Sequence, residues 1–284
     1  DGENLNDNFC VNDFSYNIAG NISTYKNKVL SLGGGTNIPG KTHLGNQVNT
    51  MIEPGKPIGY FYGYKMDGVF QTQEEINNYR GGPDNTIIMP TAEPGDLKFV
   101  DLNGDGKLGE EDRTMIGNPH PDFTFGLTLS GEYKGFDLSM FFQGSVGNDI
   151  LNILKYDIYS GTGWYNAPKD IFDKFWTGPG STNENFAISA NSRDNLTMSE
   201  WYIENGSYVR LKNVTLGYTF PKQWVQKLTV QNLRLFVAAQ NLFTITSYSG
   251  LDPELGNSNP AFMGIDMGWY PQARSFMVGL SLKL

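Results

Sequence analysis

The chain has 284 residues, enough for one large β domain or two smaller domains. Its single cysteine, Cys10, excludes an intrachain disulfide and a zinc site built on cysteines. A net charge of −9 disfavours a surface that follows phosphates, so no nucleic-acid partner is expected. An aromatic content of 13% and 34 glycines indicate an ordered chain with many turns.

Apolar and polar residues alternate with period two from near the N-terminus, which predicts strands with one apolar face. The first predicted strand runs over 14–23. Residues 123–130 and 136–143 predict two more strands, joined by a turn at Lys134-Gly135. These two form a hairpin with one apolar face.

The same alternation returns in the C-terminal third, over 213–220, 233–240 and 275–284. The apolar positions change parity between Leu211 and Val214, which predicts a β-bulge near Lys212. The last predicted strand continues to the final residue.

Three long stretches without clear period separate these strands, at about 31–120, 151–204 and 247–271. They are rich in Gly, Pro, Asn and Asp, and they are long for the connections of a compact sandwich. Short helices are predicted around Gln73–Tyr79 and Ala167–Trp176, the second beginning at Pro168.

Two interpretations of the strand pattern compete. In a soluble sandwich the apolar face packs into a core, whereas in a membrane barrel it meets lipid and the polar face lines the lumen. Strands of about 9 to 11 residues and aromatic residues at strand ends favour the barrel. Those aromatic residues are Tyr133, Tyr218, Phe220 and Tyr248. The residues expected to face lipid are Phe125, Leu127, Leu138, Met140, Leu216, Leu235 and Leu280.

Residues 101–112 match a calcium-binding loop. The oxygen donors Asp101, Asn103 and Asp105 occupy positions 1, 3 and 5, Gly106 allows the sharp turn, and the Lys107 carbonyl stands at position 7. Position 12 is Asp112 in place of the usual Glu. The sequence predicts a structural Ca²⁺ bound by Asp101, Asn103, Asp105, Lys107 and Asp112, and a metal-free Asx-rich turn is the alternative.

Catalytic motifs are lacking, and no catalytic residue is assigned. The only histidines, His43 and His120, stand outside any serine-hydrolase or zinc-protease motif, so the chain is not expected to be an enzyme. Aromatic residues gather in the long stretches, where they either bind partners and sugars or pack into small apolar clusters. They are Tyr60-Phe61-Tyr62-Gly63-Tyr64, Trp164-Tyr165, Trp176, Trp201-Tyr202 and Trp269-Tyr270.

Several separated blocks, in order, resemble the SusC/RagA-type TonB-dependent outer-membrane transporters of the Bacteroidetes. The blocks are Pro57–Phe70, Gly95–Gly106, Ile116–Phe123, Tyr133–Leu138, Gln143-Gly144, Gly147–Asp149, Ser207–Tyr218, Ala239–Phe243, Gly250–Glu254 and Tyr270-Pro271. Together they cover nearly the whole chain.

This resemblance implies the C-terminal portion of a 22-stranded transmembrane antiparallel β-barrel, with six to eight of its strands in residues 1–284. It implies long extracellular loops, import of glycan fragments or peptides, a SusD-like lipoprotein lid, and energy supplied through TonB. The N-terminal plug, the TonB box and a signal peptide are not found in this chain. It is therefore expected to be one part of a longer protein in the outer membrane of a Gram-negative bacterium.

A second hypothesis remains open from the residues alone: a secreted, calcium-stabilised β-sandwich that binds carbohydrate. The two hypotheses differ in what covers the apolar strand face, which is lipid in a barrel and a second sheet in a sandwich. No substrate-binding residue is assigned under either.

Overall fold

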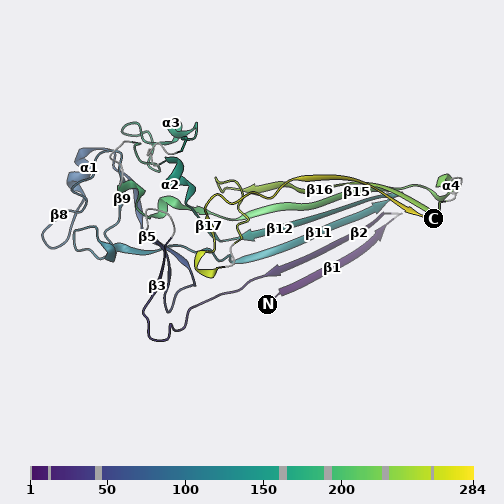
Figure 1. Cartoon of the computed structure of the whole chain (residues 1–284), viewed down its shortest axis with the longest axis horizontal. Coiled ribbons are helices and arrows are strands. Elements are labelled where there is room, and N and C mark those ends of the chain that lie inside the picture. The colour runs from purple at the N-terminus through teal and green to yellow at the C-terminus, as the bar shows by residue number, and fades with distance from the viewer. Residues whose placement is uncertain are drawn as a thin grey trace.

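The computed structural model describes residues 2–11, 14–41, 47–159, 165–188, 194–225, 230–256 and 259–284. A long twisted sheet extends from a compact region of loops and short elements (Figure 1). None of the described helices is long and apolar enough to cross a membrane.

The long sheet, here called the main sheet, has seven antiparallel strands in the order β1-β2-β11-β12-β15-β16-β18. The strands are β1 (Gly2–Val11), β2 (Phe14–Ser23), β11 (Phe123–Tyr133), β12 (Phe136–Val146), β15 (Tyr208–Thr219), β16 (Asn232–Thr246) and β18 (Ser275–Lys283). The predicted strands are confirmed, and their number lies in the expected range. Strand β1 was missed because the polar run Asn6–Asn8 obscures its alternation.

The connections differ in length at the two ends of the main sheet (Figure 1). At one end Lys134 and Gly135 form a two-residue turn with φ of 47° and 88°, as the tight hairpin turns of twisted strands require. A short connection with helix α4 (Lys222–Val225) joins β15 to β16 there. At the other end lie the long connections 24–122, 147–207 and 247–274. These agree closely with the predicted irregular stretches.

One face of the main sheet is apolar. Strand register carries the pattern across neighbouring strands: Leu138 pairs with Leu216, Leu216 with Val237, and Val237 with Val278. Leu138, Leu216 and Val278 are 38%, 46% and 77% exposed. Among the described residues no second sheet covers this face, whereas a β-sandwich requires one.

The predicted bulge near Lys212 is confirmed. The register of β15 shifts against β12 between Phe141 and Phe142, and against β16 between Leu211 and Asn213. Because the bulge adds one residue to β15, Leu211 before it and Val214 after it lie on the same face of the main sheet.

The long connections fold into small sheets. One has the order β10-β5-β4-β3, another β14-β13-β17, and two further pairs are β6-β9 and β7-β8. Their bounds are β3 (Ile38–Lys41), β4 (Val48–Ile52), β5 (Tyr60–Tyr64), β6 (Met66–Val69), β7 (Arg80–Gly81), β8 (Thr86–Ile87), β9 (Leu97–Phe99), β10 (Arg113–Gly117), β13 (Asp149–Asn152), β14 (Ile203–Asn205) and β17 (Ile265–Asp266). Strands β13 and β17, from different long connections, pair in parallel.

The helices of this region are short: α1 (Gln73–Asn78), α2 (Leu154–Tyr159) and α3 (Ile171–Lys174). Helix α1 confirms the prediction, and the Thr72 hydroxyl caps it by accepting a hydrogen bond from the Glu75 amide. Helix α3 is shorter than predicted. It ends at Lys174, and the next residue, Phe175, packs into the apolar cluster described next.

Fourteen buried residues from all three long connections form one cluster, here called the loop core. They are Phe61, Tyr64, Val69, Leu97, Phe99, Leu151, Ile153, Phe175, Phe186, Leu196, Met198, Trp201, Tyr202 and Ile265. Several of the loop aromatics therefore hold the loops together, among them Phe61, Trp201 and Tyr202, which are at most 5% exposed. Tyr165 and Tyr270 are exposed, while Trp164 lies outside the described residues.

Candidate functional site

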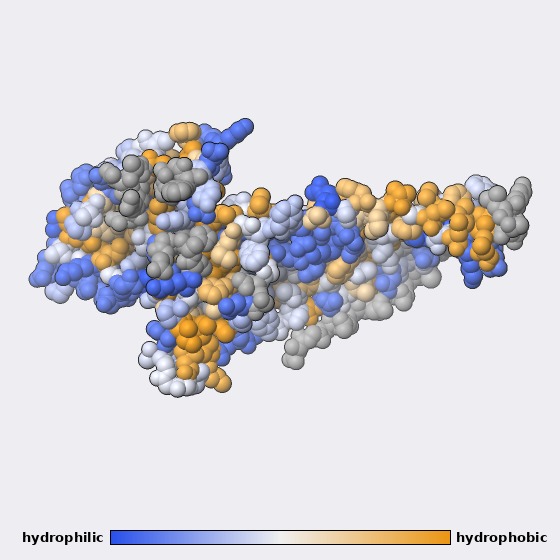
Figure 2. All heavy atoms as spheres, in the orientation of Figure 1, coloured by the Kyte–Doolittle hydropathy of each residue, from blue (hydrophilic) through white to orange (hydrophobic). Residues whose placement is uncertain are grey.

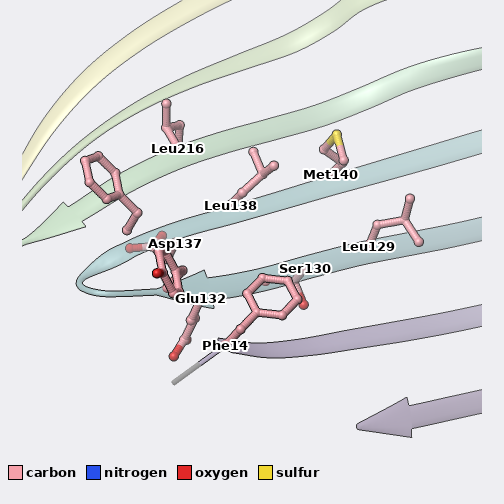
Figure 3. A pocket seen from close by; sticks show the side chains of 11 residues that line it. Phe14, Leu129, Ser130, Glu132, Asp137, Leu138, Met140 and Leu216 are labelled. Carbon is pink, nitrogen blue, oxygen red and sulfur yellow. The ribbon is translucent and has the colours of Figure 1, made fainter. Parts of the chain in front are cut away.

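The apolar face of the main sheet is a distinctive surface of the described chain. In Figure 2 apolar atoms gather toward the short-turn end of the sheet, whereas hydrophilic residues dominate much of the loop surface. In Figure 3 the side chains of Leu129, Leu138, Met140 and Leu216 stand on one side of their strands. A face of this size without a cover in the described chain is suited to hydrocarbon.

Aromatic rings border this face at the short-turn end. The Phe136 and Tyr218 rings lie 4.6 Å apart between centroids, and the Phe14 and Tyr133 rings 6.4 Å apart. Such a belt is typical of side chains at a membrane–water interface. Tyr248 does not belong to such a belt. It lies beyond the end of β16, is 6% exposed, and donates its hydroxyl to Asp266 Oδ2 at 2.6 Å.

The opposite face of the main sheet is polar and carries an ion pair. Arg234 on β16 reaches Asp137 on β12 across the intervening strand, with Nε 2.8 Å from Oδ1. Gly217 on β15 makes this possible, because a Cβ there would lie 2.4 Å from Asp137 Oδ1 and 2.5 Å from Arg234 Nη2. The polar residues Ser130, Ser139 and Gln240 share this face by strand register.

A buried charge cluster ties the third long connection to the main sheet. Arg210 on β15 is 3% exposed and donates from Nη2 to Asp252 Oδ1 at 2.5 Å and from Nη1 to Glu254 Oε2 at 2.7 Å. Its Nε donates to Thr244 Oγ1 at 2.8 Å, and Lys212 Nζ lies 2.7 Å from Glu254. Each of the three guanidinium nitrogens of Arg210 thereby donates to a carboxylate or hydroxyl oxygen, as burial requires.

The pKa of Asp252 is lowered by this arrangement. Burial alone would raise it, but hydrogen bonds from Arg210 and from the amides of Gln272 and Glu254 outweigh burial. Asp252 is therefore ionised at neutral pH. By accepting hydrogen bonds from the amides of Glu254 and Gln272, it holds these two parts of the third connection together.

A second cluster joins the second and third connections. Lys155 Nζ lies 2.9 Å from Glu204 Oε1, and Glu204 also accepts hydrogen bonds from the amide and hydroxyl of Ser249 at 2.9 Å. Burial raises the pKa of Glu204, yet Lys155 and Ser249 bring it below its usual value. The segment after β16 is thus held at both Ser249 and Asp252.

A cleft of about 510 Å³ opens beside the second cluster. Its lining includes the rings of Tyr159 and Trp201 and two ion pairs, Lys155–Glu204 at 2.9 Å and Lys174–Asp170 at 2.6 Å. These four charges neutralise one another, and Glu184, which also lines the cleft, leaves the lining with one more carboxylate than cations.

The predicted calcium loop forms a tight turn in which side-chain oxygens accept main-chain hydrogen bonds. Asp101 accepts from the amides of Gly104 and Gly106 at 2.7 and 2.8 Å, and Asn103 and Asp105 accept from the amides two residues on. Asp112 is fully buried and accepts from the amides of Leu102, Asn103 and Gly109.

No group of three or more His, Cys, Asp or Glu side chains in the described chain is gathered as a metal site. The candidate ligands Asp101, Asn103 and Asp105 lie in one turn of the chain, and Asn103 Nδ2 is 3.3 Å from Asp105 Oδ2. The calcium assignment therefore stays a prediction.

Of the two histidines, the structure describes His120. His43 lies outside the described residues. The ring nitrogens of His120 are hydrogen-bonded to the Tyr25 hydroxyl at 3.1 Å and to the Ile58 carbonyl at 2.9 Å. His120 thus joins the start of the first long connection to its later part.

The sequence reasoning missed the pairing of Arg210 with Asp252 and Glu254. Both segments stood among the blocks that carried the family resemblance, but nothing in either block states that they touch. The sequence carries no signal for this contact, because an acidic partner is required only by the burial of Arg210, which the structure shows.

Comparison with known proteins identifies relatives of the chain. No family model matches it. It is 37% identical over 290 residues to TonB-dependent receptor P3 of Formosa agariphila, covering 97% of this chain and 27% of the relative. It is 28% identical over 284 residues to TonB-dependent receptor SusC of Bacteroides thetaiotaomicron, covering 95% of this chain and 24% of SusC. The chain thus spans about a quarter of the length of these curated relatives.

Solved structures show the same fold. The structure of the RagAB peptide transporter superposes with a TM-score of 0.74 at 20% identity, over 99% of this chain and 28% of the matched chain. The RagAB peptide importer in its closed-closed state gives a TM-score of 0.70 at 20% identity, over 98% of this chain and 28% of the matched chain.

Proposed function

Because the chain is homologous along nearly its whole length to one segment of the SusC-type TonB-dependent receptors, we propose that it forms the C-terminal portion of a transmembrane β-barrel that imports large nutrients across the outer membrane. The observation that carries this proposal is the main sheet, with one exposed apolar face, one polar face, and short turns opposite long connections.

The main sheet requires further strands in this function. Its outer strands β1 and β18 each pair on one side only within the described chain. Unpaired backbone groups in hydrocarbon cost several kcal/mol each, so a barrel must close on itself. The remaining strands and the plug belong to the rest of the receptor, for a total of 22 strands in the transporters it resembles.

The long connections are the extracellular side in this proposal. A SusD-like lipoprotein lid docks on them, and the TonB complex acts through the N-terminal part of the receptor. The loop core and the two charge clusters support this role, because they give the loops a fixed shape for a partner to recognise. The cargo is a glycan fragment or a peptide, and the chain carries out no chemistry on it.

Fractionation of the native source tests this function. The receptor containing this chain is purified in mild detergent, and its partners are identified by mass spectrometry. Recovery from the outer membrane together with a plug-bearing N-terminal part and a surface lipoprotein is the expected result. A chain that stays soluble and monodisperse without detergent contradicts the proposal.

Cargo is tested separately, by growth of a receptor deletion strain. We expect growth to fail on one polymeric nutrient, glycan or protein hydrolysate, and to persist on its monomers. A strain without functional TonB is expected to show the same defect. Normal growth of the deletion strain on every polymer that the parent uses contradicts import by this receptor.

We also propose that residues 101–112 bind a structural Ca²⁺ through Asp101, Asn103, Asp105 and the Lys107 carbonyl, with Asp112 at position 12. The spacing of these oxygen donors supports it, and Ca²⁺ would supply charge neutralisation within the turn. Asp112 also holds the turn by accepting three main-chain hydrogen bonds.

Removal of calcium tests this site. A chelator is expected to increase protease cleavage near residues 101–112 of the purified receptor and to weaken lid binding, and Asp101→Ala is expected to reproduce both effects. The affinity class of extracellular calcium loops, roughly 10⁻⁴–10⁻³ M, sets the concentrations to use. Equal cleavage with and without chelator would show that the turn holds itself without metal.

A further inference from the structure

A hollow in the apolar face of the main sheet lies at its short-turn end, away from the loop core and both charge clusters. Its volume is about 300 Å³. Gly131 of β11 provides its floor, because this glycine pairs with Tyr16 on one side and Leu138 on the other and has no side chain to fill the space. Around it stand the side chains of Phe14, Leu129, Tyr133, Phe136, Leu138, Met140 and Leu216 (Figure 3).

The acidic residues of the same strands leave the hollow apolar. Glu132 and Asp137 contribute to its lining, but their positions in the register place their side chains on the opposite face. Figure 3 shows Glu132 extending away from the side on which Leu138 and Leu216 stand. A hollow with a carbon lining on a lipid-facing surface takes up an alkyl chain rather than water.

A cation stands at the rim. Lys134, in the turn between β11 and β12, is exposed, and its Nζ lies 5.1 Å from the centroid of the Tyr133 ring that walls the hollow. Tyr133 and Phe136 belong to the aromatic belt, which marks the level of the lipid headgroups. An ammonium group at that level is complementary to a phosphate.

We propose that this hollow binds one phospholipid, with an acyl chain over Gly131 and its phosphate at Lys134. The inference rests on the proposed function, in which short barrel turns face the periplasm. The hollow is formed by β2, β11, β12 and β15, which are consecutive in the main sheet, so it is complete without strands from the rest of the receptor.

Two glycines on the apolar face allow a matched test. A Cβ at Gly131 would lie 3.5 Å from the Phe14 ring, and a Cβ at Gly20 would lie 3.7 Å from the Gly126 carbonyl. Both are ordinary contacts, and neither glycine has a positive φ. Gly131→Leu fills the hollow, whereas Gly20→Leu adds the same side chain to the same face outside it.

The experiment is native mass spectrometry of the full receptor, purified from outer membranes and stripped of loosely held lipid by detergent. The wild type and Gly20→Leu are expected to retain one phospholipid that Gly131→Leu loses. Lys134→Gln is expected to lower the retention of phospholipid while leaving the binding of added diacylglycerol unchanged.

Each other outcome overturns the site. Equal phospholipid retention by wild type and Gly131→Leu contradicts the proposed site. Retention of lipopolysaccharide in place of phospholipid contradicts the proposed ligand. Membrane insertion is checked first for every variant by fractionation and heat-modifiable migration. A wild-type receptor found outside the membrane contradicts the proposed function itself. This result separates failure of the proposed function from failure of the lipid site.

Discussion

The main sheet and the loop region place the same kinds of side chain in opposite environments. In the loop region Phe61, Leu151 and Ile265 are at most 1% exposed, whereas on the main sheet Val278 and Leu280 are 77% and 58% exposed. The loop region is organised like a water-soluble domain, with its apolar residues inside. The main sheet leaves one apolar face uncovered in the described chain, which is the arrangement that the proposed membrane barrel requires.

The largest expected effect comes from truncation inside the loop core. Phe61→Ala is expected to destabilise the loop region by about 3–5 kcal/mol, because it leaves a cavity among packed side chains. Phe276→Ala removes the same ring from the apolar face, where lipid can fill the space, and should cost far less. Hydrogen exchange in the purified receptor measures both effects, from the loop amides for Phe61→Ala and from the β16 and β18 amides for Phe276→Ala. Equal effects would erase the distinction between the two regions.

Breaking the buried charge cluster should cost nearly as much. Arg210→Met leaves Asp252 buried without its cation and is expected to cost about 3–5 kcal/mol. The partly exposed pair of Arg234 with Asp137 provides the control, and Arg234→Met should cost about 1 kcal/mol or less. Protease cleavage within 247–274 and thermal unfolding report the difference. Unchanged cleavage in Arg210→Met would show that the cluster does not anchor this connection.

Exchanging the two faces of the main sheet should have an intermediate effect. Leu127→Arg puts a charge on the apolar face near the middle of β11 and is expected to cost about 2–4 kcal/mol. Thr128→Arg, the next residue, puts it on the polar face and should be milder. Urea unfolding of the receptor refolded into lipid vesicles measures both variants. A larger loss for Thr128→Arg would mean that the faces are assigned the wrong way round.

Acidification should loosen the third connection by the smallest amount. The pKa values of Asp252 and Glu204 are lowered in the fold from their ordinary 3.8 and 4.5. A carboxyl with a lowered pKa stabilises the fold above its unfolded pKa, and this stabilisation is lost as the pH falls through the folded value. Pulsed hydrogen exchange should therefore show 247–274 fully protected at neutral pH and progressively less protected below pH 4.5.

Arg210→Met serves as the reference for this titration, because the cation that lowers the pKa of Asp252 is then absent. Its protection should depend less on acid than that of the wild type. An identical pH profile in the two proteins would assign the transition to other carboxyls.

The main sheet could be predicted from the sequence because period-two alternation is a local signal. The hairpin at Lys134-Gly135 and the bulge near Lys212 followed from residues a few positions apart. The loop core could not be predicted in this way. Its members, such as Phe61 and Ile265, are distant in the sequence, and local pattern does not separate a buried ring from an exposed one.

The charge clusters could not be predicted from the sequence for the same reason, because Arg210 and Asp252 meet only after the third connection folds back. The ligand set at Asp101–Asp112 is different. Its spacing is local and was recognised, but whether an ion occupies it depends on affinity, which spacing does not determine.

The parallel pairing of β13 with β17 has a consequence for the order of assembly. It joins residues 151–152 to 265–266, and the loop core likewise includes both Phe61 and Ile265. Contacts so far apart along the chain form slowly, because a long loop must close first. The loop core can therefore reach its final packing only after residues up to Asp266 are available, which leaves its apolar residues exposed until then.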